Sequence, residues 1–334
     1  MMTNRYMLVC TIIVITLFSG TFSSAIAGDF PSKPMEIIIS SSPGSGGSIY
    51  TQLMAKLGSK YLGVPINVLH KPGGNGNVAC DYLYKKPADG HTLNLWNASY
   101  AGYMNYPAFS TKPNDFIYLC ITQKTLYSLA VHKDRPFKTI HDLIAYAKKN
   151  PGKLDIGSSK LGNPQHLNIV KFSTAAGIDV NYIPYKGTGA AVKDLLGKHL
   201  TVAEAQPYLV IPHAENLRIL LLFNETRIKE LPDTPVPAEI GLKYDFYHQG
   251  YGIMLKKGVP EDRLAIIRDA YKKVFSDPEF ISFVKKSAGQ EARWVDREEF
   301  TKTFYSDFKM VGETLIKYKI VDADKVRSRK ITLD

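Results

Sequence analysis

Residues 35–57 read MEIIISSSPGSGGSIYTQLMAKL, and this stretch decides the fold. A β-branched run over residues 35–39 predicts a short strand, and the Ser/Gly/Pro run after it predicts a loop. The apolar side chains of Ile49, Tyr50, Leu53, Met54 and Leu57 then recur at helical spacing, with Ser48 as the expected N-terminal cap. The pattern indicates a strand that enters a helix through a glycine-rich turn.

The same unit recurs along the chain. Residues 64–69 predict a strand before a second Gly-rich turn at 71–77, and residues 154–157 lead into a polar loop at 158–163. Residues 180–184 lead into a fourth turn at 185–189, and from Pro260 to about Val321 the pattern is helical, with breaks at Asp277-Pro278 and near Trp294. Strands that alternate with helices predict an α/β fold whose mostly parallel sheets are covered on both faces.

The composition excludes several classes of protein. The chain has 334 residues, of which 45% are apolar and 22% charged, so it is long enough for two globular domains and too apolar to be disordered. Three cysteines make no disulfide scaffold, and no C-x-x-C or H-E-x-x-H spacing occurs, which argues against zinc and leaves no cofactor to expect. The net charge of +11 fits an anionic partner of several kinds.

The N-terminus predicts export. Arg5 precedes an apolar run at 7–18, and Ala25-Ile26-Ala27 supplies the small residues that a signal peptidase needs, so residues 1–27 are predicted to be a signal peptide. Twelve apolar residues span only about 18 Å of helix, too short for a bilayer. Export to the periplasm argues against nucleic acid as the partner. Cys80 and Cys120 could pair there, although their apolar surroundings favour two buried free thiols.

The glycine-rich loops are candidate anion sites. Each lies at the carboxyl end of a predicted strand and enters a helix N-terminus, where backbone N–H groups are unpaired. The spacing lacks the third glycine of G-x-G-x-x-G and the lysine of a phosphate loop, and no G-x-S-x-G turn occurs. His166 and Glu204 either touch a ligand or serve packing and pairing. A binding receptor, a secreted enzyme on the same scaffold and a ligand-sensing module all stay open, with the first favoured.

Several motifs together resemble one known family. FPSKP at 30–34 followed by PGSGGS at 43–48, KPGGNGN at 71–77 and PADGHTL at 87–93 are similar to the opening of the tripartite tricarboxylate transporter receptors, also called Bug-type solute-binding proteins. The order continues with NPGKL at 150–154, YIPYKG at 182–187, LPDTPV at 231–236 and GVP at 258–260. The resemblance covers essentially the whole mature chain.

The resemblance implies a two-lobed flytrap, similar to type II periplasmic binding proteins, in which each lobe is a mostly parallel sheet flanked by helices. Lobe one is then residues 28–128 plus 244–334, and lobe two is residues 129–243. Such a receptor is expected to be a non-enzymatic monomer that captures a small organic anion, usually a carboxylate, and delivers it to integral membrane permease subunits.

The chain departs from the family pattern at four positions. Gly47-Ser48 stands where an acidic residue is common, Lys160 interrupts a Ser-Gly-x-Gly-Ser loop, and Thr201 replaces an aspartate. We therefore expect the fold to be kept and the ligand to differ. The expected ligand-binding residues come from the four loops and the strand ends beside them: Gly44, Ser45, Gly46, Gly47, Ser48, Gly74, Asn75, Asn97, Ser158, Ser159, Lys160, Asn163, His166, Gly187, Thr188 and Glu204.

Overall fold

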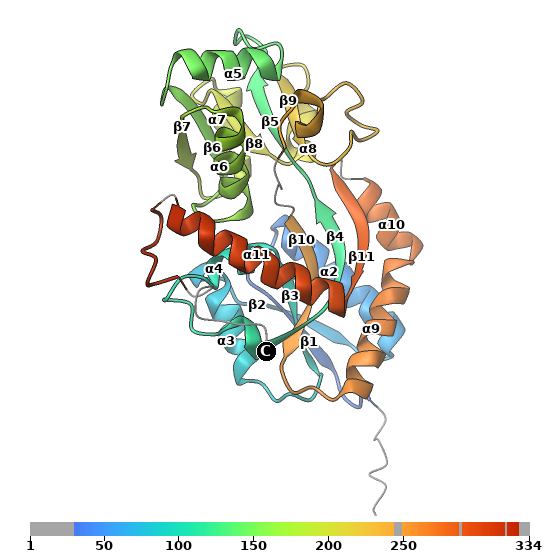
Figure 1. Ribbon diagram of the computed structural model, residues 1–334. Helices are drawn as coiled ribbons and strands as arrows, with labels where there is room; N and C mark the ends of the chain where they lie inside the picture. The colour runs from blue at the N-terminus through green and yellow to red at the C-terminus, as the bar shows by residue number, and fades with distance from the viewer. Residues whose placement is uncertain (1–29, 244–248, 287–288, 318, 327–334) are drawn as a thin grey trace, which may run out of the picture.

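A computed structural model describes residues 30–243, 249–286, 289–317 and 319–326. The predicted signal peptide, residues 1–27, lies outside the described residues. Figure 1 shows two lobes, one above the other, each built on its own sheet. The α/β class and the two-lobed architecture expected from the sequence are confirmed.

Lobe one is built on a six-stranded sheet in the order β11-β4-β10-β3-β1-β2. Strands β1, β2 and β3 pair in parallel, whereas β10 runs antiparallel to both β3 and β4, and β11 antiparallel to β4. The strands are β1 (Met35–Ile39), β2 (Ile66–His70), β3 (Thr92–Asn97), β4 (Phe116–Thr125), β10 (Gln249–Lys256) and β11 (Gln290–Asp296). The sheet is thus mixed, and not mostly parallel as expected from the sequence, because β10 and β11 enter it from a chain that returns from lobe two.

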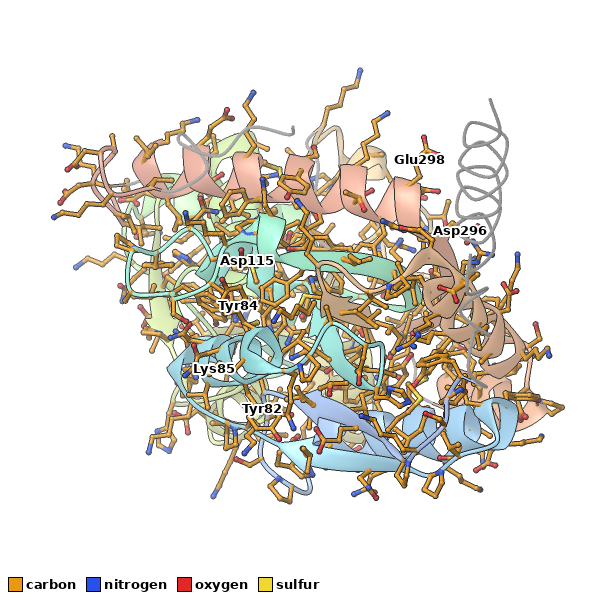
Figure 2. The ribbon with its side chains drawn as sticks, turned by 90° about the horizontal axis from the view of Figure 1, so that it is seen from below. Tyr82, Tyr84, Lys85, Asp115, Asp296 and Glu298 are labelled. Carbon is orange, nitrogen blue, oxygen red and sulfur yellow. The ribbon has the colours of Figure 1, made fainter. Side chains whose placement is uncertain are left out.

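Helices cover both faces of this sheet. Viewed from below, α11 (Arg297–Lys317) lies on one face and α2 (Gly46–Leu62) on the other (Figure 2). Helices α3 (Asn77–Lys85) and α4 (Ser99–Tyr103) pack into the same apolar cluster as α11, and α9 (Glu261–Phe275) and α10 (Pro278–Lys285) pack with α2. The outer side of α3 presents Tyr84 and Lys85 (Figure 2). Apolar side chains therefore fill both sides of the sheet, as the helical periodicity requires.

Lobe two is built on a five-stranded sheet in the order β7-β6-β8-β5-β9. Strand β6 is parallel to β7 and β8, and β5 is antiparallel to β8 and β9. The strands are β5 (Tyr127–His132), β6 (Leu154–Ser158), β7 (Val180–Pro184), β8 (Val202–Ala205) and β9 (Leu217–Phe223). The helices around them are α5 (Ile140–Lys149), α6 (Pro164–Ala176), α7 (Thr188–Leu196) and the short α8 (Pro207–Val210).

At the first of its two crossings between the lobes, the chain joins the two sheets through a single residue. Strand β4 ends at Thr125 and β5 begins at Tyr127, so Leu126 alone connects them, and its N–H donates to the carbonyl of Gly289 at 2.8 Å. Beside this crossing, the buried Lys124 donates to Asn224 Oδ1 at 2.9 Å and to Glu225 Oε2 at 2.7 Å. The crossing is short and is braced by an ion pair between the two lobes.

Two local predictions need correction. Helix α2 begins at Gly46, and its cap is Ser45, whose side chain accepts the N–H of Ser48 at 3.2 Å; Ser48 itself lies inside the first turn. The break predicted near Trp294 occurs, but it is a strand, β11, which lies at the edge of the sheet and pairs with β4. For this segment, pairing with a distant strand outweighs the local pattern.

Cys80 and Cys120 are free and fully buried, which confirms the favoured prediction. Burial raises the pKa of both thiols well above the usual value. No helix within the described residues is both long and apolar enough to cross a membrane.

Candidate functional site

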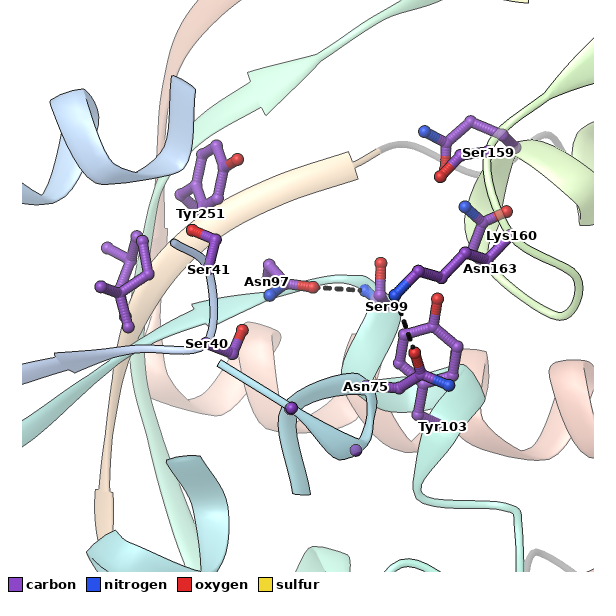
Figure 3. A pocket seen from close by; sticks show the side chains of 16 residues that line it. Ser40, Ser41, Asn75, Asn97, Ser99, Tyr103, Ser159, Lys160, Asn163 and Tyr251 are labelled. Carbon is purple, nitrogen blue, oxygen red and sulfur yellow. Dashed lines mark hydrogen bonds between the residues drawn. The ribbon is translucent and has the colours of Figure 1, made fainter. Parts of the chain in front are cut away.

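A pocket of about 380 Å³ lies between the lobes at the carboxyl ends of β1, β3 and β6. Lobe one supplies most of its wall, from three chain segments and from β10, and lobe two supplies the loop after β6 and the first turn of α6 (Figure 3). The lining residues are Ile39, Ser40, Ser41, Gly73, Gly74, Asn75, Gly76, Leu95, Asn97, Ser99, Tyr103, Ser159, Lys160, Asn163, Gln165 and Tyr251.

The wall is polar, and Lys160 is the one charged side chain among its described lining residues. Hydroxyl groups of Ser40, Ser41 and Tyr251 gather at one end, whereas Lys160 and Asn163 come from lobe two at the other (Figure 3). Helix α6 begins at this second end, so the positive end of its dipole lies there. The pocket thus has a neutral end rich in hydroxyls and a cationic end.

The lobes touch around the pocket. Lys160 Nζ of lobe two donates to Asn75 Oδ1 of lobe one at 3.2 Å (Figure 3). Gly102 of α4 lies so near lobe two that a Cβ there would be 2.5 Å from the carbonyl oxygen of Gly162. These contacts close the pocket on one side and make the relative position of the lobes part of the site.

Three predicted residues from the second loop and from the end of β3 line the pocket. Gly74 and Asn75 line the pocket from a single 3₁₀ turn, Gly74–Gly76, and Asn97 lines it from the end of β3. Asn75 adopts a φ of 54°, a left-handed conformation that Asn tolerates better than most residues. Asn97 Oδ1 accepts the N–H of Ser99 at 3.0 Å and so fixes the start of α4.

First-loop residues do not line the pocket. Gly44, Ser45 and Gly46 lie at or before the start of α2, and Gly47 and Ser48 are buried in its first turn. The preceding Ser40 and Ser41 line the pocket instead. A Cβ on Gly47 would lie 3.2 Å from Ser41 Oγ and 3.3 Å from Tyr251 Oη, so Gly47 backs the wall, whereas a Cβ on Gly46 would meet nothing within 4 Å.

In lobe two, Ser159, Lys160 and Asn163 line the pocket. Asn163 also caps α6 by accepting the N–H of His166 at 3.0 Å. Gly187 and Thr188 lie at the start of α7 and are not among the lining residues. The fourth turn therefore does not contribute to the pocket in this arrangement.

Ser158, His166 and Glu204 lie behind the wall and hold the loop. The Ser158 hydroxyl donates to Glu204 Oε2 at 2.5 Å, and Gly162 N–H donates to His166 Nδ1 at 3.1 Å. Burial raises the pKa of Glu204 to about 8, although hydrogen bonds from Ser158 and Asn168 oppose the rise, and burial lowers the pKa of His166 to about 4. Both groups are therefore neutral near pH 7.

Tyr103 and Tyr251 are lining residues that the sequence did not indicate. Tyr103 belongs to α4 and Tyr251 to β10, which reaches the pocket only after the chain has passed through lobe two. Single aromatic residues in apolar runs carry no local signal of a site. Ser40 and Ser41 did carry one, since they stand in the polar run directly after β1.

Other chemistry finds little support in the geometry. Within the described residues, no three His, Cys, Asp or Glu side chains gather as a metal site. The pocket wall holds no carboxylate, histidine or cysteine among its described residues, and its donors are hydroxyls, amides, backbone N–H groups and one ammonium. Such a set suits the binding of a small polar anion.

Comparison with known proteins identifies the family of the chain. The family described as "Tripartite tricarboxylate transporter family receptor" matches residues 49–318. The UPF0065 protein in the gbd 5′ region of Cupriavidus necator is 30% identical over 264 residues, covering 77% of this chain and 79% of its own. Protein BugT of Bordetella pertussis is 28% identical and covers 76% of this chain and 80% of its own.

A solved structure shares the fold. It is titled "R. palustris Rpa4515 with adipate", has a TM-score of 0.75 and 22% identity, and covers 86% of this chain and 97% of its own. The family match spans well over half of the chain and includes both lobes. The chain therefore belongs to the tripartite tricarboxylate transporter family of receptors and is a solute-binding receptor of the Bug type.

Proposed function

We propose that this receptor captures a small organic anion, a carboxylate, between its lobes and delivers it to integral membrane subunits of a tripartite tricarboxylate-type permease. The observation that carries the proposal is the pocket itself, a polar cavity between two lobes with one cation and no anion in its described wall. Hydrogen bonds to a charged acceptor contribute about 1.5–3 kcal/mol each. Micromolar binding is about 8 kcal/mol net of the cost of association, so it requires several such bonds, from both lobes.

We also propose that the two lobes move relative to each other when the ligand binds. Lobe boundaries at 128/129 and 243/244 stay a prediction; the first falls within β5, two residues after the crossing at Leu126. We expect a monomer whose lobes close on the ligand, because lining residues of both lobes are needed to complete the pocket. Small-angle scattering should show a smaller radius of gyration with ligand, and an unchanged radius would contradict closure.

We also propose that the chain is exported and cleaved after Ala27, so that it works in the periplasm. The mass of the protein recovered from the cell envelope should correspond to a chain that begins at Gly28. A protein that keeps its first 27 residues would contradict this.

Two alternative functions have simple tests. A secreted enzyme would convert the ligand to product, whereas a receptor returns it unchanged after long incubation. A sensor would lack permease genes beside its own gene.

The decisive experiment is a binding screen on the purified mature protein. Mono-, di- and tricarboxylates are tested by thermal shift and then by calorimetry, and at least one should raise the Tm and bind with micromolar affinity. Ser159→Trp should abolish that binding because it fills the pocket, while the matched control Ser276→Trp, at the exposed end of α9, should bind normally. Failure of every carboxylate, or equal binding by Ser159→Trp, would refute the proposal.

A further inference from the structure

The loop from Ser158 to Asn163 presents the only charged side chain of the described pocket wall. Lys160 is exposed at the mouth, and within the described residues its ammonium makes a hydrogen bond to Asn75 but no ion pair. Figure 3 shows the Lys160 side chain crossing from lobe two toward Asn75 and Ser99 of lobe one. Its positive charge is therefore not neutralised by a protein carboxylate.

The loop that carries Lys160 is held from behind by neutral groups. Ser158 bonds to the buried Glu204, the Tyr182 hydroxyl donates to the carbonyl of Ser159 at 2.7 Å, and Gly162 N–H bonds to His166. None of these supports places a negative charge beside Lys160 near pH 7. The loop is thus fixed in place without weakening the field of its ammonium.

Asn75 fixes the other end of the contact. It stands between Gly74 and Gly76, which both have positive φ, in a one-turn 3₁₀ segment that directs its side chain across the cleft. Its amide oxygen is a neutral acceptor and binds an ammonium less strongly than a carboxylate does. Since an ammonium has three donors, Lys160 can keep its hydrogen bond to Asn75 and still donate to a ligand carboxylate.

We infer that Lys160 is the specificity-determining residue of the pocket and that Asn75 is the positioning residue that holds its ammonium across the cleft. The inference rests on the proposed function and narrows it. The ligand places a carboxylate against Lys160, and its other polar end lies against the hydroxyls of Ser40, Ser41 and Tyr251. Selection is by charge at one end and by neutral hydrogen bonding at the other.

Calorimetry with succinate, glutarate and adipate, each paired with its uncharged diamide, tests the inference at neutral pH. Lys160→Met should weaken binding of the tightest dicarboxylate about 10- to 100-fold, the size expected when a charge-assisted hydrogen bond is lost. It should change the affinity for the matching diamide by less than about twofold. Lys160→Arg should restore most of the affinity for the anion, because it restores the charge.

Variants of Asn75 test whether this residue positions Lys160 or only supports the turn. Asn75→Gly keeps the left-handed turn but removes the acceptor that holds Lys160, so it should weaken anion binding several-fold in the wild type and have little effect in the Lys160→Met background. No loss in the wild type, or an equal loss in both backgrounds, would show that Asn75 does not position Lys160.

Lys153→Met is the matched control, because Lys153 is also exposed in lobe two but lies before β6, outside the pocket wall. Its affinity for the anion should equal that of the wild type. Anion binding that survives Lys160→Met overturns this inference alone. No binding of any of the three dicarboxylates to the wild type overturns the inference, and no binding of any carboxylate in the wider screen overturns the proposed function with it.

Discussion

At the scale of single residues, Glu204 is a carboxyl group that lies close to the pocket proposed to bind an anion. The side chain is fully buried at the end of β8 and hydrogen-bonded to Ser158, and burial raises its pKa to about 8. A neutral acid there would not repel the proposed carboxylate ligand. The pocket thus tolerates an acidic residue one layer behind its wall because desolvation removes the charge.

Glu204→Gln should make the protein less sensitive to rising pH. The folded pKa is raised from about 4.5 to about 8, so between these values the folded state holds a proton that the unfolded state has released, and stability falls as the pH rises through this window. Gln keeps the shape but does not titrate. Thermal melts from about pH 5 to about pH 8 should show a variant Tm that gains on the wild type toward pH 8; two parallel curves would contradict the prediction.

Some of the residues predicted to bind the ligand line the pocket and others do not, and the reasons are physical. The β2–α3 turn with Gly74 and Asn75, Asn97, and the loop with Ser159, Lys160 and Asn163 were recognisable because polar and glycine residues directly follow strands. In the first loop the prediction named residues 44–48, whereas the earlier Ser40 and Ser41 line the pocket. Local sequence does not show whether Ser41 or Ser48 faces the cleft. Tyr251 could not be found, because only the return of β10 from lobe two brings it to the wall.

At the scale of elements, the fold was predictable wherever strands are followed by helices, as in β1–α2 and β6–α6. It was not predictable where long-range pairing decides, as in β11, whose seven residues pack at the sheet edge against β4. The cap of α10 likewise combines a local contact with distant ones. Asp277 caps α10 by accepting the N–H of Glu279 at 2.8 Å, and the same carboxylate also bonds Lys60 and Tyr61 of α2.

Asp277→Ala should destabilise lobe one by about 1–2 kcal/mol, because it removes the cap and the link to α2 together. Asp277→Asn keeps the cap and should cost less. The bonds from Lys60, Glu279 N–H and Tyr61 lower the pKa of Asp277 to about 2, so its stabilising effect is complete above the usual value of 3.8 and is lost as the pH falls through about 2. Urea unfolding at neutral and acid pH measures both effects; equal losses in the two variants would show that the charge matters more than the cap.

At the scale of the whole molecule, two glycines lie where the lobes meet. Gly102 of α4 faces the carbonyl of Gly162 from the other lobe, and Gly289 faces the ring of Pro207 near the crossing at Leu126. Neither a backbone carbonyl nor a proline ring can move aside as the end of a flexible side chain does. These two glycines therefore limit how closely the lobes can approach at these points.

Gly102→Ala tests this directly. Ala suits the helix better than Gly, so the Tm should hold or rise, but its Cβ would lie 2.5 Å from the Gly162 carbonyl oxygen and should keep the lobes apart. Ligand affinity should fall, and scattering should show an incompletely closed molecule with ligand. Gly189→Ala on α7 is the control, since a Cβ there meets nothing within 4 Å. Equal affinity in the two variants would mean that closure does not need the Gly102 contact.

The two buried thiols have a practical consequence. Cys80 and Cys120 are fully enclosed, and their raised pKa keeps them as thiols, which react slowly with alkylating dyes. A cysteine introduced at the exposed Val78, three residues after Asn75 on the lobe-one side of the cleft, would then be the one readily labelled thiol in the part of the chain that the structure describes. A fluorophore attached there would sense the approach of the other lobe, which makes the unmodified scaffold ready for conversion into an optical sensor of its own ligand.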